Sequence, residues 1–344
     1  SLIKDGKKPL TNKVMSGLYP PGSTIKTIVA LSALENNVIK PSDNFRCKGK
    51  IELHGEKFHC WEKKGHGVVN LRKGIQRSCD VYFYEIARKL GVDRLSETAK
   101  KFGLGKKVLA DFIEEKSGVV PNTKWKKKFI GQNWYIGETL HSGIGQGYFL
   151  STPIQLCLMT AQIANGGFKI KPRIIVDEND EANNLQKYLD YRKKNSNNTS
   201  SIDLQVFNFN LKPLFRNQEN INFIKNAMFA ATNEIGGTSY GSRHRDEEFM
   251  FAGKTGSSQI KRFTEAQREA EVKQSDITYK ERDHAWFVAY APAKDPKYAI
   301  SVLVEHGGSG SSAAAPVAKK VIKKIIERHE TRNAMSNKNL GENI

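Results

Sequence analysis

The segment that most restricts the fold is a helix that is apolar on nearly every side. Residues 25–34 consist mainly of Ile, Val, Leu and Ala. The residues directly before them, 19–22, read Tyr-Pro-Pro-Gly, a turn that cannot continue as a helix or a central strand. The helix is therefore expected to begin after this turn, with Ser23 as its N-cap. A helix with so little polar surface has to be buried inside a large domain.

Length and charge narrow the function classes. The 344 residues suffice for one large domain or two average ones, which excludes a small disulfide-stapled scaffold. Lys and Arg number 55 against 36 acidic residues, so the formal charge is +19. A basic surface favours polyanions or an anionic membrane face, but no zinc-finger, basic-zipper or RNA-binding motif accompanies it. We therefore expect no nucleic acid partner.

The remaining pattern predicts an antiparallel sheet between helices. Strands are expected at 248–254, 284–291 and 297–305, and the short turn between the last two makes them antiparallel neighbours. Helices are expected at 81–90, 154–165 and 313–328. The last helix should pack on the sheet through an apolar stripe of Val317, Val321, Ile322 and Ile325.

The ends and one internal segment are expected to lie outside this core. We expect a single domain over 1–330, with a polar insertion at 176–203 and a flexible tail at 331–344. No window approaches the run of about 20 apolar residues that a membrane span needs, and the N-terminus shows no signal-peptide pattern. The chain is thus expected to be soluble, either mature or cut from a longer protein with its anchor upstream.

Three short elements carry chemistry, in the order Ser23-x-x-Lys26, Ser78-Cys79-Asp80 and Lys254-Thr255-Gly256. Ser23 and Lys26 lie one helical turn apart on the same face. A serine hydroxyl is a weak nucleophile and needs an adjacent base, which a lysine provides when burial keeps part of it neutral. Each element recurs by chance when alone, so the prediction of a nucleophilic site depends on their conjunction.

This order of motifs resembles the penicillin-binding serine transferases and β-lactamases. Within them, the chain is most similar to class B penicillin-binding proteins of the elongation type, penicillin-binding protein 2. The similarity extends over four stretches, at 18–26, 78–84, 144–155 and 252–257. It implies an α/β (α+β) transpeptidase fold of the penicillin-binding and β-lactamase-like kind, with an antiparallel sheet flanked by helices.

The resemblance also implies a role for each motif residue. Ser23 would attack the penultimate D-Ala carbonyl of a peptidoglycan stem peptide, and Lys26 would take its proton. Ser78 would relay the proton to the leaving D-Ala, with Lys254 nearby. The carboxylate of the substrate, which a β-lactam imitates, would be held by Lys254 and Thr255 beside Gly256, and the oxyanion by the N–H groups of Ser23 and Ser257.

Asp80 departs from the general family pattern, in which an Asn ends the second motif. A carboxylate beside Lys26 favours the charged amine, which opposes a neutral base unless the two groups share protons as a coupled pair. The elongation subgroup often has this Asp. We therefore expect Asp80→Asn to keep acylation but to shift its pH profile.

Three of the four cysteines lie within one short region, 47–79, that also contains several histidines. Thiolates and imidazoles in this number suit tetrahedral zinc. The elongation subgroup is similar in having a zinc near its second motif, and Cys47, Cys60, His66 and Cys79 occupy the matching places. Two alternatives stay open, namely a disulfide between Cys47 and Cys60, and Cys79 as a small buried apolar residue.

The resemblance implies a peptidoglycan D,D-transpeptidase that acts in cell elongation and is inhibited by β-lactams. Its catalytic domain would lie in the periplasm. A missing N-terminal part would hold a non-catalytic pedestal and the anchor in the inner membrane, and the partner of the protein would be a membrane glycan polymerase. The alternatives are a serine β-lactamase, a β-lactam sensor domain, and a basic module that binds nucleic acid or membrane. No organic cofactor is expected.

Overall fold

The computed structural model describes residues 9–109, 112–172, 174, 213–261, 264, 267, 270, 272 and 274–341. The polar insertion expected at 176–203 lies outside this range. None of the described helices combines the length and the apolarity needed to cross a membrane.

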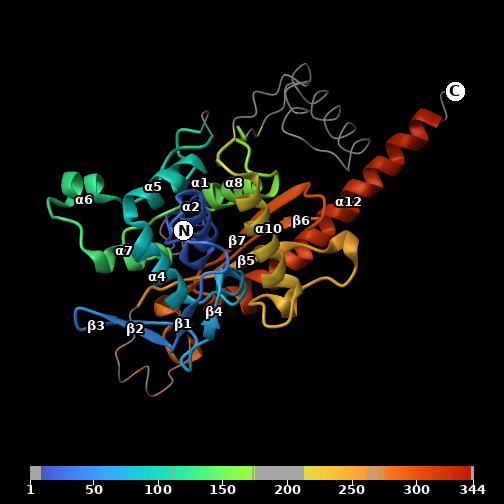
Figure 1. The fold of residues 1–344 in the computed structure, drawn as a ribbon. Helices are drawn as coiled ribbons and strands as arrows, with labels where there is room; N and C mark the ends of the chain where they lie inside the picture. The colour runs from blue at the N-terminus through green and yellow to red at the C-terminus, as the bar shows by residue number, and fades with distance from the viewer. Residues whose placement is uncertain are drawn as a thin grey trace.

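A three-stranded antiparallel sheet forms the centre of the fold (Figure 1). It has the order β5 (Ala252–Ser258), β6 (His284–Ala291) and β7 (Tyr298–Val304). Side chains alternate along β6 between two apolar clusters, because successive residues of a strand point to opposite faces. Trp286 and Val288 pack in the larger, helical core, whereas Phe287 and Ala289 pack with the C-terminal helix.

Helices cover both faces of this sheet. The helix α12 (Ala315–Gly341) lies on one face and extends away from the body in Figure 1. The other face packs on α8 (Pro153–Ala164) and α10 (Gln218–Asn233). Helix α2 (Lys26–Glu35) packs on α10 and is buried along nearly its whole length, as its apolar sequence requires. The remaining α-helices are α1 (Lys13–Ser16), α3 (Leu71–Gln76), α4 (Asp80–Leu90), α5 (Val92–Lys101), α6 (Thr123–Ile130) and α7 (Ile136–Gly143).

Two small antiparallel sheets of two strands each lie beside the helical core. One pairs β1 (Phe45–Cys47) with β4 (Gly67–Val69), and the other pairs β2 (Lys50–Leu53) with β3 (Glu56–His59). Together they bring the cysteine-rich segment next to the start of α4. Short helical turns complete the described chain, namely η2 (Gly22–Ile25), η3 (Tyr240–Ser242), η4 (Glu247–Phe249), η5 (Gln274–Asp276), η6 (Tyr279–Glu281) and the π-turn η7 (Gly310–Ala314).

Helix ends with strong local signals are close to their predicted places. Gly91 ends α4 as expected. At the start of α8, Thr152 and Gln155 form a capping box, and the helix ends just before Gly166. Ser23, however, is not an N-cap: it lies within the 3-10 turn η2, which has Pro21 at its N-cap position. The two prolines end the preceding extended segment, as predicted. The helical turn that follows them, η2, is wound more tightly than an α-helix.

Two predictions on the C-terminal side are wrong. The first strand spans 252–258 instead of 248–254, because the turn η4 occupies 247–249 and only the later residues pair with β6. The last helix starts at Ala315 and continues to Gly341, past the end predicted near residue 328. The flexible tail expected at 331–344 stays a prediction.

The stripe by which α12 packs on the sheet also differs from the prediction. Val317, Val321 and Ile325 are exposed, and of the predicted stripe only Ile322 is buried. The buried stripe is Ala315, Ala318, Ile322 and Ile326, which is rotated about the helix axis from the predicted one. Small alanines allow the helix to approach the sheet closely, so this face is selected by fit and not by hydrophobicity alone.

Candidate active site

The three predicted motifs meet at one cleft of about 840 Å³. Ser23 comes from the turn before α2, Ser78 and Asp80 from the start of α4, and Thr255, Gly256 and Ser257 from β5. All six line the cleft. Lys26 and Lys254, which the sequence also predicted, are fully buried behind its wall.

Lys26 connects the first motif to the second. Its ammonium Nζ lies 2.7 Å from Asp80 Oδ1 and donates hydrogen bonds to the Ser78 carbonyl at 2.8 Å and the Ser78 hydroxyl at 3.3 Å. The side chain is 0% exposed, so these groups replace the hydration that a buried ammonium loses. Because the Lys26 amine contacts both the Ser78 hydroxyl and the Asp80 carboxylate, it can exchange protons with both groups.

Ser78 has an unusual backbone, with φ of +55°. A residue with a Cβ is strained in this left-handed region and persists there only when its surroundings hold it. The turn directs both the carbonyl and the hydroxyl of Ser78 toward Lys26. This geometry explains why Ser78 and Asp80, two positions apart, both reach the same ammonium.

Asp80 is also held from the opposite side. Its second oxygen, Oδ2, accepts a hydrogen bond from the backbone N–H of Trp61 at 2.9 Å. Burial raises the pKa of the Asp80 carboxyl, and the adjacent Lys26 ammonium opposes that rise. The two groups therefore form a buried ion pair.

The third motif supplies a second lysine. Burial lowers the pKa of Lys254 well below its usual value, and the nearby Lys26 ammonium lowers it further. Lys254 Nζ donates to the Thr255 carbonyl at 3.1 Å. The Thr255 hydroxyl donates to that of Thr238 at 2.8 Å, and both threonines line the cleft. Thr238 was missed by the sequence analysis because no motif surrounds it.

Close backbone contact fixes the position of the first motif. Gly22 donates its N–H to the Gly145 carbonyl at 3.0 Å, and both glycines have positive φ. A Cβ on Gly145 would lie 2.2 Å from the Gly22 carbonyl oxygen. The two backbones can touch only because neither residue has a side chain. Nearby, Gln146 donates to the Ser257 carbonyl at 3.1 Å, which joins this loop to β5.

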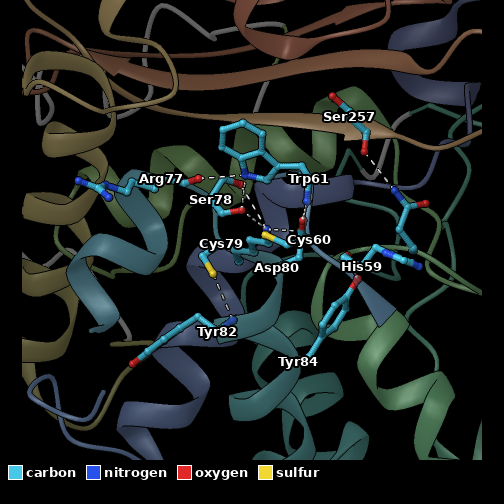
Figure 2. A network of polar contacts seen from close by, with 12 residues as sticks. His59, Cys60, Trp61, Arg77, Ser78, Cys79, Asp80, Tyr82, Tyr84 and Ser257 are labelled. Carbon is cyan, nitrogen blue, oxygen red and sulfur yellow. Dashed lines mark hydrogen bonds and ion pairs between the residues drawn. The ribbon is translucent and has the colours of Figure 1, made fainter. Parts of the chain in front are cut away.

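Trp61 is a second residue that the sequence analysis missed. Figure 2 shows its indole lying across the second motif, with the N–H donating to the carbonyls of Arg77 and Ser78, each at 3.1 Å. With its backbone N–H on Asp80, it contacts the motif at both ends. Its position next to Cys60, a predicted metal ligand, was the available signal.

The four predicted metal ligands come together beside this motif. Single ligand atoms of Cys47, Cys60, His66 and Cys79 all lie within 4.8 Å of one another. His66 Nδ1 is 3.7 Å from Cys47 Sγ and 3.5 Å from Cys60 Sγ. Tetrahedral zinc, with Zn–S near 2.3 Å and Zn–N near 2.0 Å, requires S···N distances of about 3.5 Å. The donor set and its spacing therefore fit zinc.

The three thiols of the cluster differ in pKa. A hydrogen bond with Cys79 lowers the pKa of Cys60 to about 3, and the same bond together with burial raises the pKa of Cys79. Burial also raises the pKa of Cys47. All of the cysteines are free thiols in this structure, so the alternative disulfide between Cys47 and Cys60 is not formed. Cys79 also accepts a hydrogen bond from the Tyr82 N–H at 3.4 Å and so caps α4 (Figure 2).

Comparison with known proteins identifies the family. Residues 3–323 match the family described as the penicillin binding protein transpeptidase domain. The chain belongs to this family. Curated relatives named peptidoglycan D,D-transpeptidase MrdA include one from Salmonella typhimurium, 33% identical over 95% of this chain and 49% of its own length. Another, from Acinetobacter baumannii, is 35% identical over 92% of this chain and 44% of its own.

Solved structures agree with this assignment. Pseudomonas aeruginosa PBP2 in complex with WCK 5153 has a TM-score of 0.75 and 35% identity, covering 94% of this chain and 64% of that one. The complex of PBP2 and MreC from Helicobacter pylori has a TM-score of 0.77 and 33% identity, covering 95% and 53%. The predicted transpeptidase fold and the resemblance to penicillin-binding protein 2 are thus confirmed. The chain spans about half the length of the curated relatives it matches.

Proposed function

We propose that this chain is the catalytic domain of a peptidoglycan D,D-transpeptidase that works through a serine acyl-enzyme. The main support is the buried Lys26 ammonium, which contacts Ser78 and Asp80 behind the cleft that Ser23 lines. The relatives named D,D-transpeptidase support the same reaction class.

In the proposed acylation step, Ser23 Oγ attacks the penultimate D-Ala carbonyl of a stem peptide. Lys26 in its neutral form takes the hydroxyl proton, and its contacts with Ser78 provide the path by which the proton reaches the leaving D-Ala amine. Asp80 remains beside Lys26 and stabilises the ammonium formed in this step. The amine of a second stem peptide then attacks the ester carbonyl, which forms the amide of the cross-link, breaks the bond to Ser23 Oγ and returns the amine's proton to that oxygen through Lys26.

The opposite wall of the cleft would bind the charged parts of the substrate. Lys254 and Thr255 are proposed to hold the terminal carboxylate, which favours the ammonium form of Lys254 when it binds. The N–H groups of Ser23 and Ser257 are proposed as the oxyanion hole, where fixed donors stabilise the charge that develops on the carbonyl oxygen.

Zinc is proposed as a structural ion held by Cys47, Cys60, His66 and Cys79. Bound there, it would supply folding free energy and no step of the reaction, because all four tetrahedral positions are taken by protein ligands. The residues after two of these ligands, Trp61 and Asp80, contact each other. The cluster is therefore placed to stabilise the second motif.

The whole protein is proposed to be anchored in the inner membrane, with this domain in the periplasm. Its proposed partners are stem peptides, β-lactam antibiotics and a membrane glycan polymerase of the elongation machinery. Solved PBP2 structures from two relatives, one in complex with WCK 5153 and one with MreC, support a bound compound and a protein partner for this group.

The test is the intact mass of the chain over time after mixing with benzylpenicillin. A single lasting adduct that is lost in Ser23→Ala would support the acyl-enzyme, and cross-linking of stem peptides would then separate a transpeptidase from a sensor domain. Rapid turnover of the adduct with consumption of the drug would indicate a β-lactamase instead. No adduct on the wild type would refute the proposal.

A further inference from the structure

A basic and aromatic surface lies outside the cleft, on α6 and the loop that follows it. We call it the α6 rim and define it by Lys124, Lys127, Lys128, Phe129 and Tyr135. All five residues are exposed, and the two rings strongly so, with Phe129 at 64% and Tyr135 at 63%. In Figure 1, α6 projects from the side of the molecule. An exposed apolar patch rimmed by polar residues is a mark of an interaction surface.

The charge of the α6 rim has a single sign. Five lysines and no acidic residue occur between Glu115 and Glu138. Glu138, at the edge of this segment, is paired with the buried Lys126 at 2.5 Å. The exposed lysines of the rim therefore face solvent with no acidic neighbour in their own segment, and an anionic partner would complement them.

The rim is held in place by packing beneath it. The buried Lys126 ammonium lies 4.6 Å from the centre of the Tyr135 ring and 5.9 Å from that of Tyr148. Trp125 directly precedes Lys126 in α6, and the centres of the Trp125 and Tyr148 rings lie 5.4 Å apart. Because these contacts fix α6 and Tyr135 before any ligand binds, binding loses little conformational entropy.

The α6 rim is continuous with the cleft. Helix α7 starts directly after Tyr135. Its residue His141 lines the cleft, and the centre of its ring lies 5.3 Å from that of Phe58. Tyr148, beneath the rim, lies two residues from Gln146, another lining residue. A long ligand with its reacting end in the cleft can therefore extend along α7 onto the rim, a distance of about 12 Å by helix geometry.

We propose that the α6 rim binds the glycan strand of uncross-linked peptidoglycan, with sugar rings on Phe129 and Tyr135 and stem-peptide carboxylates on the three lysines. This inference rests on the proposed function, since it extends the same substrate beyond the cleft. Aromatic faces pack against the apolar faces of sugars, and the lysines supply the charge complement. Continuity with the cleft favours this polymer over an anionic bilayer, which has no group to place beside Ser23.

The test measures binding of purified, uncross-linked glycan strands with their stem peptides to the 344-residue chain. Charge reversal by K124E, K127E and K128E together should weaken binding at least ten-fold, and F129A with Y135A should weaken it several-fold. The matched control is K320E, K323E and K324E on α12, which changes the net charge equally and should leave binding within two-fold. Melting temperatures verify that each variant is folded.

Two results would overturn the proposal. Equal weakening by both triple variants would mean that net charge alone drives binding, and binding of phosphatidylglycerol vesicles without binding of strands would assign the rim to a membrane. The benzylpenicillin adduct of the wild type is measured in parallel. An adduct without strand binding refutes only the α6 rim, whereas loss of the adduct refutes the proposed function itself.

Discussion

Replacing Trp61 by Phe tests how the second motif is held. The change keeps an aromatic ring over the motif and keeps the backbone N–H that contacts Asp80 at 2.9 Å. It removes the indole N–H, which donates to the carbonyls of Arg77 and Ser78, together with part of the ring surface. Ser78 would then keep its strained φ of +55° with one donor fewer, the remaining one being Lys26.

The magnitude follows from the environment of the lost hydrogen bond. Such a bond is worth about 1 kcal/mol net, and the 57% exposure of Trp61 excludes the larger values of buried groups. If this free energy is lost where Ser78 has to be aligned with Lys26, acylation slows about five-fold. The affinity for benzylpenicillin before acylation should change less, because the ring that lines the cleft remains.

The assay is the acylation rate constant at a series of benzylpenicillin concentrations, which separates initial binding from the acylation step. The control is Trp134→Phe, which removes an indole hydrogen bond to the Thr139 hydroxyl of 2.8 Å outside the cleft lining. We expect it to lower stability by a similar amount and to leave acylation unchanged. Wild-type acylation in Trp61→Phe, or equal slowing in both variants, would refute the positioning role of Trp61.

Three further outcomes are expected. The purified chain should contain one zinc per molecule, and removal of the metal by a chelator or by Cys60→Ser should lower the melting temperature by about 5 to 10 °C. The control variant Cys157→Ser should leave the melting temperature unchanged. Metal-free protein with an unchanged melting temperature would contradict the zinc site. Asp80→Asn should keep acylation but move the rising limb of the acylation rate against pH to lower pH, because Lys26 loses the carboxylate 2.7 Å away that favours its charged form. A pH profile identical to that of the wild type would disprove this. Burial lowers the pKa of His284 to about 4, so the unfolded state binds more protons between pH 4 and 6.5 and stability falls as the pH drops through that range. Melting temperatures of His284→Asn should fall less steeply over the same range, and an equal slope would exclude His284 as the cause.

The sequence determined those features that depend on neighbouring residues. The prolines before Gly22 end one segment, Gly91 ends α4, and Thr152 caps α8, because turns and caps are set by a few adjacent residues. The order of the three motifs likewise indicated the family and the motif residues that line the cleft. The resemblance to the elongation subgroup predicted the three cysteines and His66 that gather beside the second motif.

Only the tertiary structure decided which distant groups meet. Trp61 and Thr238 belong to no motif, and they reach the cleft because a hairpin and a loop are packed against α4 and β5. The face of α12 that is buried could not be predicted either, since Val321 and Ile322 lie on adjacent stripes of similar hydrophobicity. Helix rotation is set by the shape of the sheet beneath it, and that shape exists only after the strands, far apart in the sequence, have paired.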